Sequence, residues 1–379
     1  MRWLGGIAGA VLLALMLWDA FETIILPRRV SGRIRITKLF YRSTWIPWRA
    51  TAQILSGRRR DAFLSFFGPL SLILLLALWA VGIVVSFGLL QWADGSALNV
   101  SGGTPGFATD LYMSGTTFVT LGLGDVAPSS PIAKALTAVE AGMGFAFLAV
   151  VIGYFPVIYQ AFSRREVAIS LLDARAGSPP SASELLWRHR GDTGTAALTD
   201  LLRDWERWAA DVLESHLSYP PLAYFRSQHY NESWLAALTT ILDASAVVMI
   251  GIEGWCARQA ELTFAMARHA VVDLAQVFST PPQGGAPERL SSEQLAGLRQ
   301  RLAAGGVSLR DRPDFEQRLT ELRRMYEPYV AALAHYLAVP LPPWVREVER
   351  PDNWQTSAWD RVVKLPARER AAGSEEEHF

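Results

Sequence analysis

Three long apolar segments constrain what this chain can fold into more than any other feature. They cover residues 3–26, 62–90 and 132–162, and a helix needs about 20 such residues to cross roughly 30 Å of hydrocarbon. Half of the residues are hydrophobic and 19% are charged, against roughly 25% charged residues in soluble domains. The sequence therefore predicts an all-α membrane protein that also carries a water-compatible part.

The first apolar segment, 3–26, has two interpretations, a retained span and a cleaved signal peptide. It is long for a signal peptide, and no pattern of small residues that would mark a cleavage site precedes the basic residues. We expect a retained N-terminal span. Asp19 and Glu22 interrupt it, either as functional intramembrane acids or as acids near the cytoplasmic end that reach Arg28 or Arg29.

A basic connector, residues 27–61, follows the first span and sets the topology. Residues 27–60 contain ten basic residues and no acid. Positive charge stays on the cytoplasmic side, so we expect a multi-pass protein of the cell (inner) membrane with its N-terminus outside. Aromatic residues alternate with the arginines, which fits an interfacial helix on anionic lipid over 28–60, broken by Pro47. A solvated connector fits the same pattern equally well.

A short segment and a glycine strip lie between the second and third spans. Residues 108–119 are too short to cross the membrane and predict a re-entrant helix, whose backbone must be covered by protein or water. The strip that follows reads Thr120-Leu121-Gly122-Leu123-Gly124-Asp125.

The two glycines of the strip allow positive φ at alternate positions. Successive carbonyls can then face one axis and replace the water around a dehydrated monovalent cation. We expect Leu121 and Leu123 to point into the wall, Thr120 to add a hydroxyl at the inner end, and Asp125 to place negative charge at the outer mouth.

This strip resembles the pore loop of tetrameric potassium channels, whose usual signature is Thr-Val-Gly-Tyr-Gly-Asp. The order of outer helix (62–90), pore helix (108–119), filter (120–125) and inner helix (132–162) is also the family's. Leucine in the tyrosine position is similar to the second pore loop of two-pore-domain potassium channels.

The resemblance implies a homotetramer that conducts ions passively and needs no cofactor. Potassium would bind at the carbonyls of Thr120, Leu121, Gly122, Leu123 and Gly124, with Asp125 at the outer mouth.

The resemblance also implies gating roles for two residues of the inner helix, Gly144 as a hinge and Pro156 as a kink. Each residue equally fits an ordinary small or kinked position in a packed span.

Some positions depart from the family pattern. Leu123 lacks the tyrosine hydroxyl that braces the filter, and Thr116 replaces a common pore-helix glutamate. Tyr112 and Met113 stand where many members carry a tryptophan pair. Potassium is the expected ion, and the sequence leaves the choice against sodium open.

The strip has two other interpretations. It satisfies the G-x-G-x-x-A pattern of a dinucleotide loop, with Glu140 downstream. However, Pro128 and Pro131 interrupt the helix that should begin there, and Asp125 would repel a pyrophosphate. The second is a structural glycine turn in a non-conducting protein, a membrane-anchored helical sensor or scaffold. No constellation of residues indicates an enzyme, and the scattered histidines do not indicate a metal site.

The C-terminal half predicts a linker (163–182), a cytoplasmic α-helical domain (183–338) and a partly extended tail (339–379). Residues 235–252 are apolar enough to mimic a fourth span, but alanine, threonine and serine supply much of that apolarity and Asp243 lies inside. We expect a buried core helix there. No glycine-rich βαβ unit follows residue 170, and no nucleic-acid partner is expected, so the domain's ligand or partner is unassigned.

Overall fold

The computed structural model describes residues 2–26, 36–100, 104–191, 194–229, 231–252, 255–284, 288–307, 309–310, 313–346 and 351–355. These residues are mainly helical, with only two short strands, and the predicted all-α membrane fold is confirmed. They form two compact units. The first unit comprises Met1–Ser56 with Phe63–Gln160, and the second comprises Gly57–Ala62 with Ala161–Phe379.

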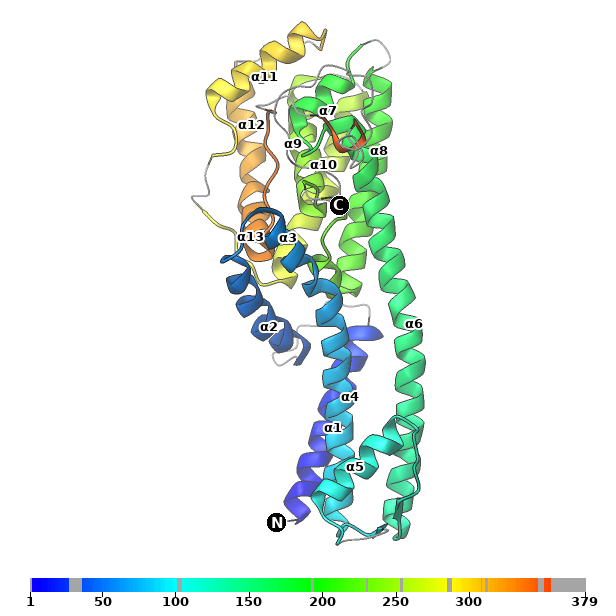
Figure 1. Cartoon of the computed structure of the whole chain (residues 1–379). Coiled ribbons are helices and arrows are strands. Elements are labelled where there is room, and N and C mark those ends of the chain that lie inside the picture. Colours follow the sequence, from blue (N-terminus) through cyan, green and yellow to red (C-terminus); the bar gives the residue numbers. More distant parts are fainter. Residues whose placement is uncertain are drawn as a thin grey trace, which may run out of the picture. The chain divides into compact units, whose positions relative to one another are not determined.

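The first unit is built on two long helices, α1 (Arg2–Ile24) and α4 (Phe67–Ala93), which lie side by side (Figure 1). Glycines allow this contact. A Cβ atom at Gly5 would lie 2.7 Å from the Trp92 ring, and one at Gly82 would lie 2.6 Å from the sulfur of Met16. Small residues at such crossings let two helix backbones approach closely, as in other membrane helix pairs.

A single α-helix, α2 (Ile36–Ala52), occupies much of the basic connector and continues through Pro47. The predicted break at Pro47 is therefore wrong. Proline removes one backbone hydrogen bond, but the helix packs on both sides of it, because the rings of Trp45 and Trp48 contact Phe67 at centroid distances of 4.7 and 5.7 Å. A shorter helix, α3 (Gly57–Ser65), then leads into α4.

The segment between α4 and the third span contains one more helix, α5 (Phe107–Phe118), and two short strands. β1 (Leu98–Val100) pairs antiparallel with β2 (Val126–Pro128). This ribbon, which the sequence did not predict, joins the chain before α5 to the chain after the glycine strip.

The third span is part of the longest helix, α6 (Pro131–Ala176). It belongs to the first unit up to Gln160 and to the second unit from Ala161. Residues 163–176, predicted as linker, are helical. They contain no glycine or proline and are rich in residues that favour helices, and Gly177, at φ +84°, ends the helix.

Arg165 fixes the end of α6 within the second unit. It donates hydrogen bonds to the carbonyl oxygens of Leu222 (2.9 Å) and Phe225 (2.7 Å) and lies 3.2 Å from Nε2 of His216. Burial, and then the charge of Arg165, lower the pKa of His216 to about 3. The imidazole is therefore neutral, with Nδ1–H toward the carbonyl of Val212 at 2.8 Å.

The second unit is a helical domain around α9 (Trp234–Gly251). α9 packs against α7 (Ala182–Arg188), α8 (Gly194–Ser218), α10 (Trp255–Val277), α12 (Phe315–Arg324) and α13 (Glu327–Leu337). The unit also contains α11 (Ser292–Ala304) and the short 3-10 helices η1 (Pro220–Tyr224) and η2 (Asn353–Gln355).

Among the described residues, four stretches are long and apolar enough to cross a membrane: α1, Gly57–Ala93, α6 and α9. Burial separates α9 from the others. The apolar window of α9 is 94% buried inside the protein, against 17% in both α1 and α6. α9 is thus covered by protein, as expected for a core helix.

Candidate functional site

The glycine strip begins where α5 ends, and its backbone alternates between two conformations. Thr120, Gly122 and Gly124 have positive φ angles of 57°, 54° and 80°, and the two leucines between them do not. The amide groups of Leu121 and Gly122 both donate to the carbonyl of Thr116, at 2.8 and 3.3 Å. The end of α5 therefore continues directly into the strip.

Positive φ, rather than crowding, explains the two glycines. No atom lies within 4 Å of a Cβ built at Gly122 or Gly124, so a side chain would have room at either position. The positive φ angle would nevertheless strain the backbone of any residue other than glycine. Leu121 and Leu123 are 58% and 61% exposed in the single chain. In the single chain, therefore, residues 120–125 are all exposed, including the two leucines expected to point into a wall.

Asp125 is held at the end of the strip by Tyr112. The phenol of Tyr112, on α5, donates to Oδ2 of Asp125 at 3.0 Å. The hydroxyl of Thr116 donates to the carbonyl of Met113 within α5, at 3.0 Å. Sequence reasoning recorded Tyr112 only as a departure from the family, and missed its contact with Asp125.

Behind the strip, Ser114 of α5 connects α4 and α6. Its hydroxyl lies 2.7 Å from the carbonyl oxygen of Val84 and is hydrogen-bonded to Oε1 of Glu140. Glu140 and Ser114 are both fully buried. A single acid inside an apolar span was the available signal, but sequence reasoning considered Glu140 only as a partner of a dinucleotide loop.

Gly144 lies where α6 passes the C-terminal end of α5. A Cβ atom at this position would overlap the carbonyl oxygen of Phe118, two residues before the strip. Glycine is therefore required by close packing, whatever its part in gating. Pro156 lies within α6, which is helical on both sides of it.

Near the C-terminal end of α1, Asp19 links α1 to α2 and α4. Its carboxylate accepts hydrogen bonds from the backbone N–H and the hydroxyl of Thr37, at 3.1 and 2.6 Å, and from the indole of Trp79 at 2.9 Å. Glu22 accepts from Trp18 at 2.9 Å. Arg28 and Arg29, the partners considered from the sequence, lie outside the described residues.

Comparison with known proteins agrees with this arrangement. Residues 72–160, which include the strip, match a protein family described as ion channel. The match supports a likeness of this part of the chain to the pore-loop ion channels. The match points to transport rather than catalysis and disfavours the dinucleotide loop. The described residues contain no group of three or more His, Cys, Asp or Glu side chains suited to a metal ion.

The chain is also similar to the "Uncharacterized membrane protein YdjJ" of Bacillus subtilis (strain 168). The two are 25% identical over 249 residues, which cover 65% of this chain and 70% of the relative. This similarity is longer than the channel segment, so part of it lies outside residues 72–160. No solved structure matches the chain.

Proposed function

We propose that the protein is a potassium-preferring channel in which four copies of the chain surround one ion path. The observation that carries the proposal is the alternation of positive φ at Thr120, Gly122 and Gly124, in an exposed strip that follows a short helix. One strip cannot surround an ion, whereas four strips around an axis supply rings of carbonyl oxygens.

In this proposal potassium passes the carbonyls of residues 120–124, with Asp125 at the outer mouth. α6 lines the path below them, and Gly144 and Pro156 are the positions where its movement would open or close the path. Large apolar side chains exposed along α6 in the single chain would meet neighbouring copies or lipid; they include Val139, Phe145, Leu148, Ile152, Phe155 and Tyr159.

The membrane arrangement is part of the same proposal. The N-terminus faces outward from the inner membrane, and the second unit lies in the cytoplasm, because the basic connector and Arg164 and Arg165 follow the ends of spans. α2, with its basic residues and its exposed Leu39 and Ile46, lies on anionic lipid.

Cation flux tests the proposal. The full chain, purified and placed in vesicles of phosphatidylethanolamine and phosphatidylglycerol, should pass potassium faster than sodium. Gly122→Ala should reduce potassium flux by at least about 10-fold, since alanine disfavours φ of +54°. Gly191→Ala is the matched control, because Gly191 also has positive φ and open space but lies in the second unit.

Asp125→Asn should reduce flux less than Gly122→Ala, because it removes charge at the mouth and leaves the carbonyls in place. Native mass spectrometry should find four copies of the chain. Wild-type vesicles without cation flux under every gating condition tested would overturn the proposal. A membrane-anchored sensor or scaffold would then account for the chain better.

A further inference from the structure

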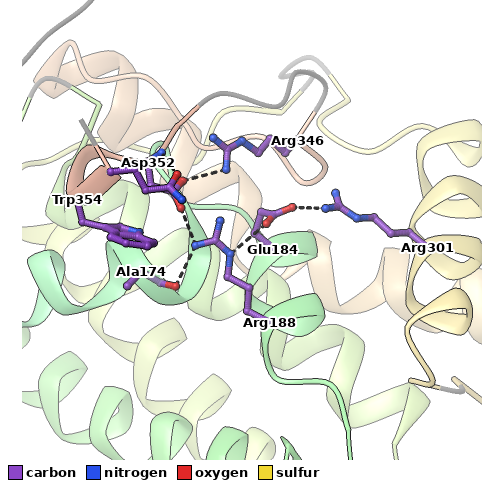
Figure 2. Close-up of a pocket in the computed structure, with 8 residues that line it drawn as sticks. Ala174, Glu184, Arg188, Arg301, Arg346, Asp352 and Trp354 are labelled. Atoms are coloured by element: carbon purple, nitrogen blue, oxygen red, sulfur yellow. Dashed lines mark hydrogen bonds and ion pairs between the residues drawn. The ribbon is translucent and has the colours of Figure 1, made fainter. Parts of the chain in front are cut away.

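A cavity of about 390 Å³ lies in the second unit, beside the last turn of α6 (Figure 2). Its size is near the lower end of the roughly 300–1,000 Å³ typical of small-molecule sites. Three groups of residues far apart in sequence form it: the end of α6 with α7, Arg301 of α11, and Arg346 with residues 352–355. Its lining residues are Ala174, Glu184, Arg188, Arg301, Arg346, Asp352, Trp354 and Gln355.

Arg188 is the centre of the cavity wall. Its guanidinium donates to Glu184 at 3.1 Å, to Asp352 at 2.8 Å and to the backbone carbonyl of Ala174 at 2.9 Å. Asp352 also pairs with Arg346 at 3.0 Å. Figure 2 shows the Arg188 side chain between the carboxylates of Glu184 and Asp352, with the carbonyl of Ala174 below it. The cavity wall therefore includes the C-terminal end of α6.

The lining carries three guanidinium groups and two carboxylates, and it does not expose them equally. The side chains of Glu184 and Asp352 are 6% and 3% exposed, whereas those of Arg188 and Arg301 are 23% and 31% exposed. Arg301 is held at one edge by a 2.5 Å contact with Glu184. An entering ligand would thus meet guanidinium groups first, with the carboxylates largely covered beneath them.

Trp354 supplies a different surface at the opposite edge. Trp354 is 63% exposed, while its backbone N–H is fixed to Asp173 at 3.1 Å. Large aromatic side chains usually bury most of their area. An anchored residue with an open indole beside a set of guanidinium groups offers a plane on which a flat ring can stack.

We propose that this cavity binds a nucleoside monophosphate, with the phosphate on the guanidinium groups of Arg188 and Arg301 and the base on the indole of Trp354. Guanidinium forks match phosphate oxygens in pairs. The volume suits one nucleotide better than two. Binding is independent of conduction; an effect on ion flux, exerted through the end of α6, would rest on the function proposed above.

Binding to the full chain in detergent tests the site, with adenosine monophosphate, adenosine and inorganic phosphate as separate probes. We expect the monophosphate to bind at least about 10-fold more tightly than either fragment, and to quench tryptophan fluorescence. Trp354→Ala should weaken it by about 10-fold, as expected for loss of one stacked base, and Trp354→Phe should retain most of it.

Arginine variants test the phosphate end. Arg301→Lys keeps the charge next to Glu184 but loses the planar fork, and should also weaken binding. Arg203→Lys is the matched control, since Arg203 pairs with Asp200 on the surface of α8 in the same unit. Arg301 is partly exposed and Arg203 is exposed, and lysine keeps the charge at both, so neither change should prevent folding, which a thermal melt would check.

Several results would overturn the proposal. These are no binding of the monophosphate, equal binding of phosphate alone or of adenosine alone, and binding that survives both Trp354→Ala and Arg301→Lys. Binding without conduction would leave the site intact and contradict only the proposed function.

Discussion

At the scale of single residues, one hydroxyl holds an acid inside the membrane part. The hydroxyl of Ser114 lies within donating distance of two oxygens, the carbonyl oxygen of Val84 and Oε1 of Glu140. Glu140 is fully buried, and a buried polar group is costly unless it has a hydrogen-bond partner. Glu140 therefore depends on Ser114 for its place between the helices.

Replacing Glu140 tests this dependence. Glu140→Gln keeps an oxygen acceptor for Ser114 and nearly the same shape, so thermal stability and flux should stay close to wild type. Glu140→Ala removes the acceptor and leaves a void, and should lower the free energy of unfolding by about 2 kcal/mol. Thermal unfolding in detergent measures the stability of both variants. Equal damage from glutamine and alanine would contradict this explanation.

A second acid, Glu232, lies in the second unit. Burial, and then the nearby Asp173 and Glu166, raise the pKa of Glu232 from its ordinary value near 4.5 to about 7, against a hydrogen bond from Asn353 that lowers it. The folded protein thus holds this proton more tightly than the unfolded chain. The contribution of Glu232 to unfolding free energy is highest below about pH 4.5, falls as the pH rises toward 7, and is constant above.

We therefore expect Glu232→Gln to stabilise the protein at pH 8 by on the order of 1–2 kcal/mol, allowing for partial exposure to solvent, and to change little at pH 4. The measurement is the difference in unfolding free energy between the variant and the wild type at a series of pH values. His216 is the same in both proteins, so its own effect on stability at low pH cancels in that difference. Glu261→Gln, at an exposed ion pair, is the control. A constant difference across pH would contradict the assignment.

At the scale of helices, the contact between α6 and the end of α5 is the closest one behind the strip. Gly144→Ala would push a methyl group into the carbonyl of Phe118, so the pore helix or α6 must move. We expect lower thermal stability together with lost flux. A hinge role alone would change opening without lowering stability, so the two measurements separate the explanations.

Gly142→Ala and Gly153→Ala are the matched controls for Gly144→Ala. Both glycines lie on α6 with no atom of this chain within 4 Å of a Cβ. Alanine in a helix interior is favoured over glycine by up to about 1 kcal/mol, so these variants should be as stable as wild type. A Gly144→Ala protein as stable as the controls would contradict the packing explanation.

Most of the helices could be predicted from the sequence, because length and apolar composition are local properties. Contacts between helices could not. Asp19 meets Thr37 and Trp79 from two other elements, and Glu140 meets Ser114 across 26 positions. The two strands are three residues each, too short for a pattern, and the helix through Pro47 depends on packing around Phe67.

At the scale of the strip, the sequence predicted that both glycines serve positive φ, because only glycine adopts it without strain. It did not predict the same conformation at Thr120. Nor could it place Tyr112 against Asp125, because a side-chain contact across 13 positions leaves no periodic signal.

At the scale of the whole molecule, the core helix α9 has a consequence for how the chain is made. By length and composition α9 could be a membrane span. During synthesis it reaches the membrane-insertion machinery before the later helices of the second unit have been made. The partners of Asp243 are Arg289, 46 residues later, and Tyr326, 83 residues later, with contacts of 2.6 Å each. While α9 emerges, Asp243 itself is the feature that opposes insertion, at a cost of about 2.5–3.5 kcal/mol.

The acid therefore has two tasks separated in time, as a sorting signal during synthesis and as a packing partner afterwards. Asp243→Leu should place α9 in the membrane in a fraction of molecules and move the C-terminal end to the opposite side. A C-terminal reporter fusion whose activity depends on the compartment measures that fraction, and Asp211→Leu, on the exposed face of α8, should leave it unchanged. A uniform orientation of the Asp243→Leu protein would show that sorting is decided elsewhere in the chain.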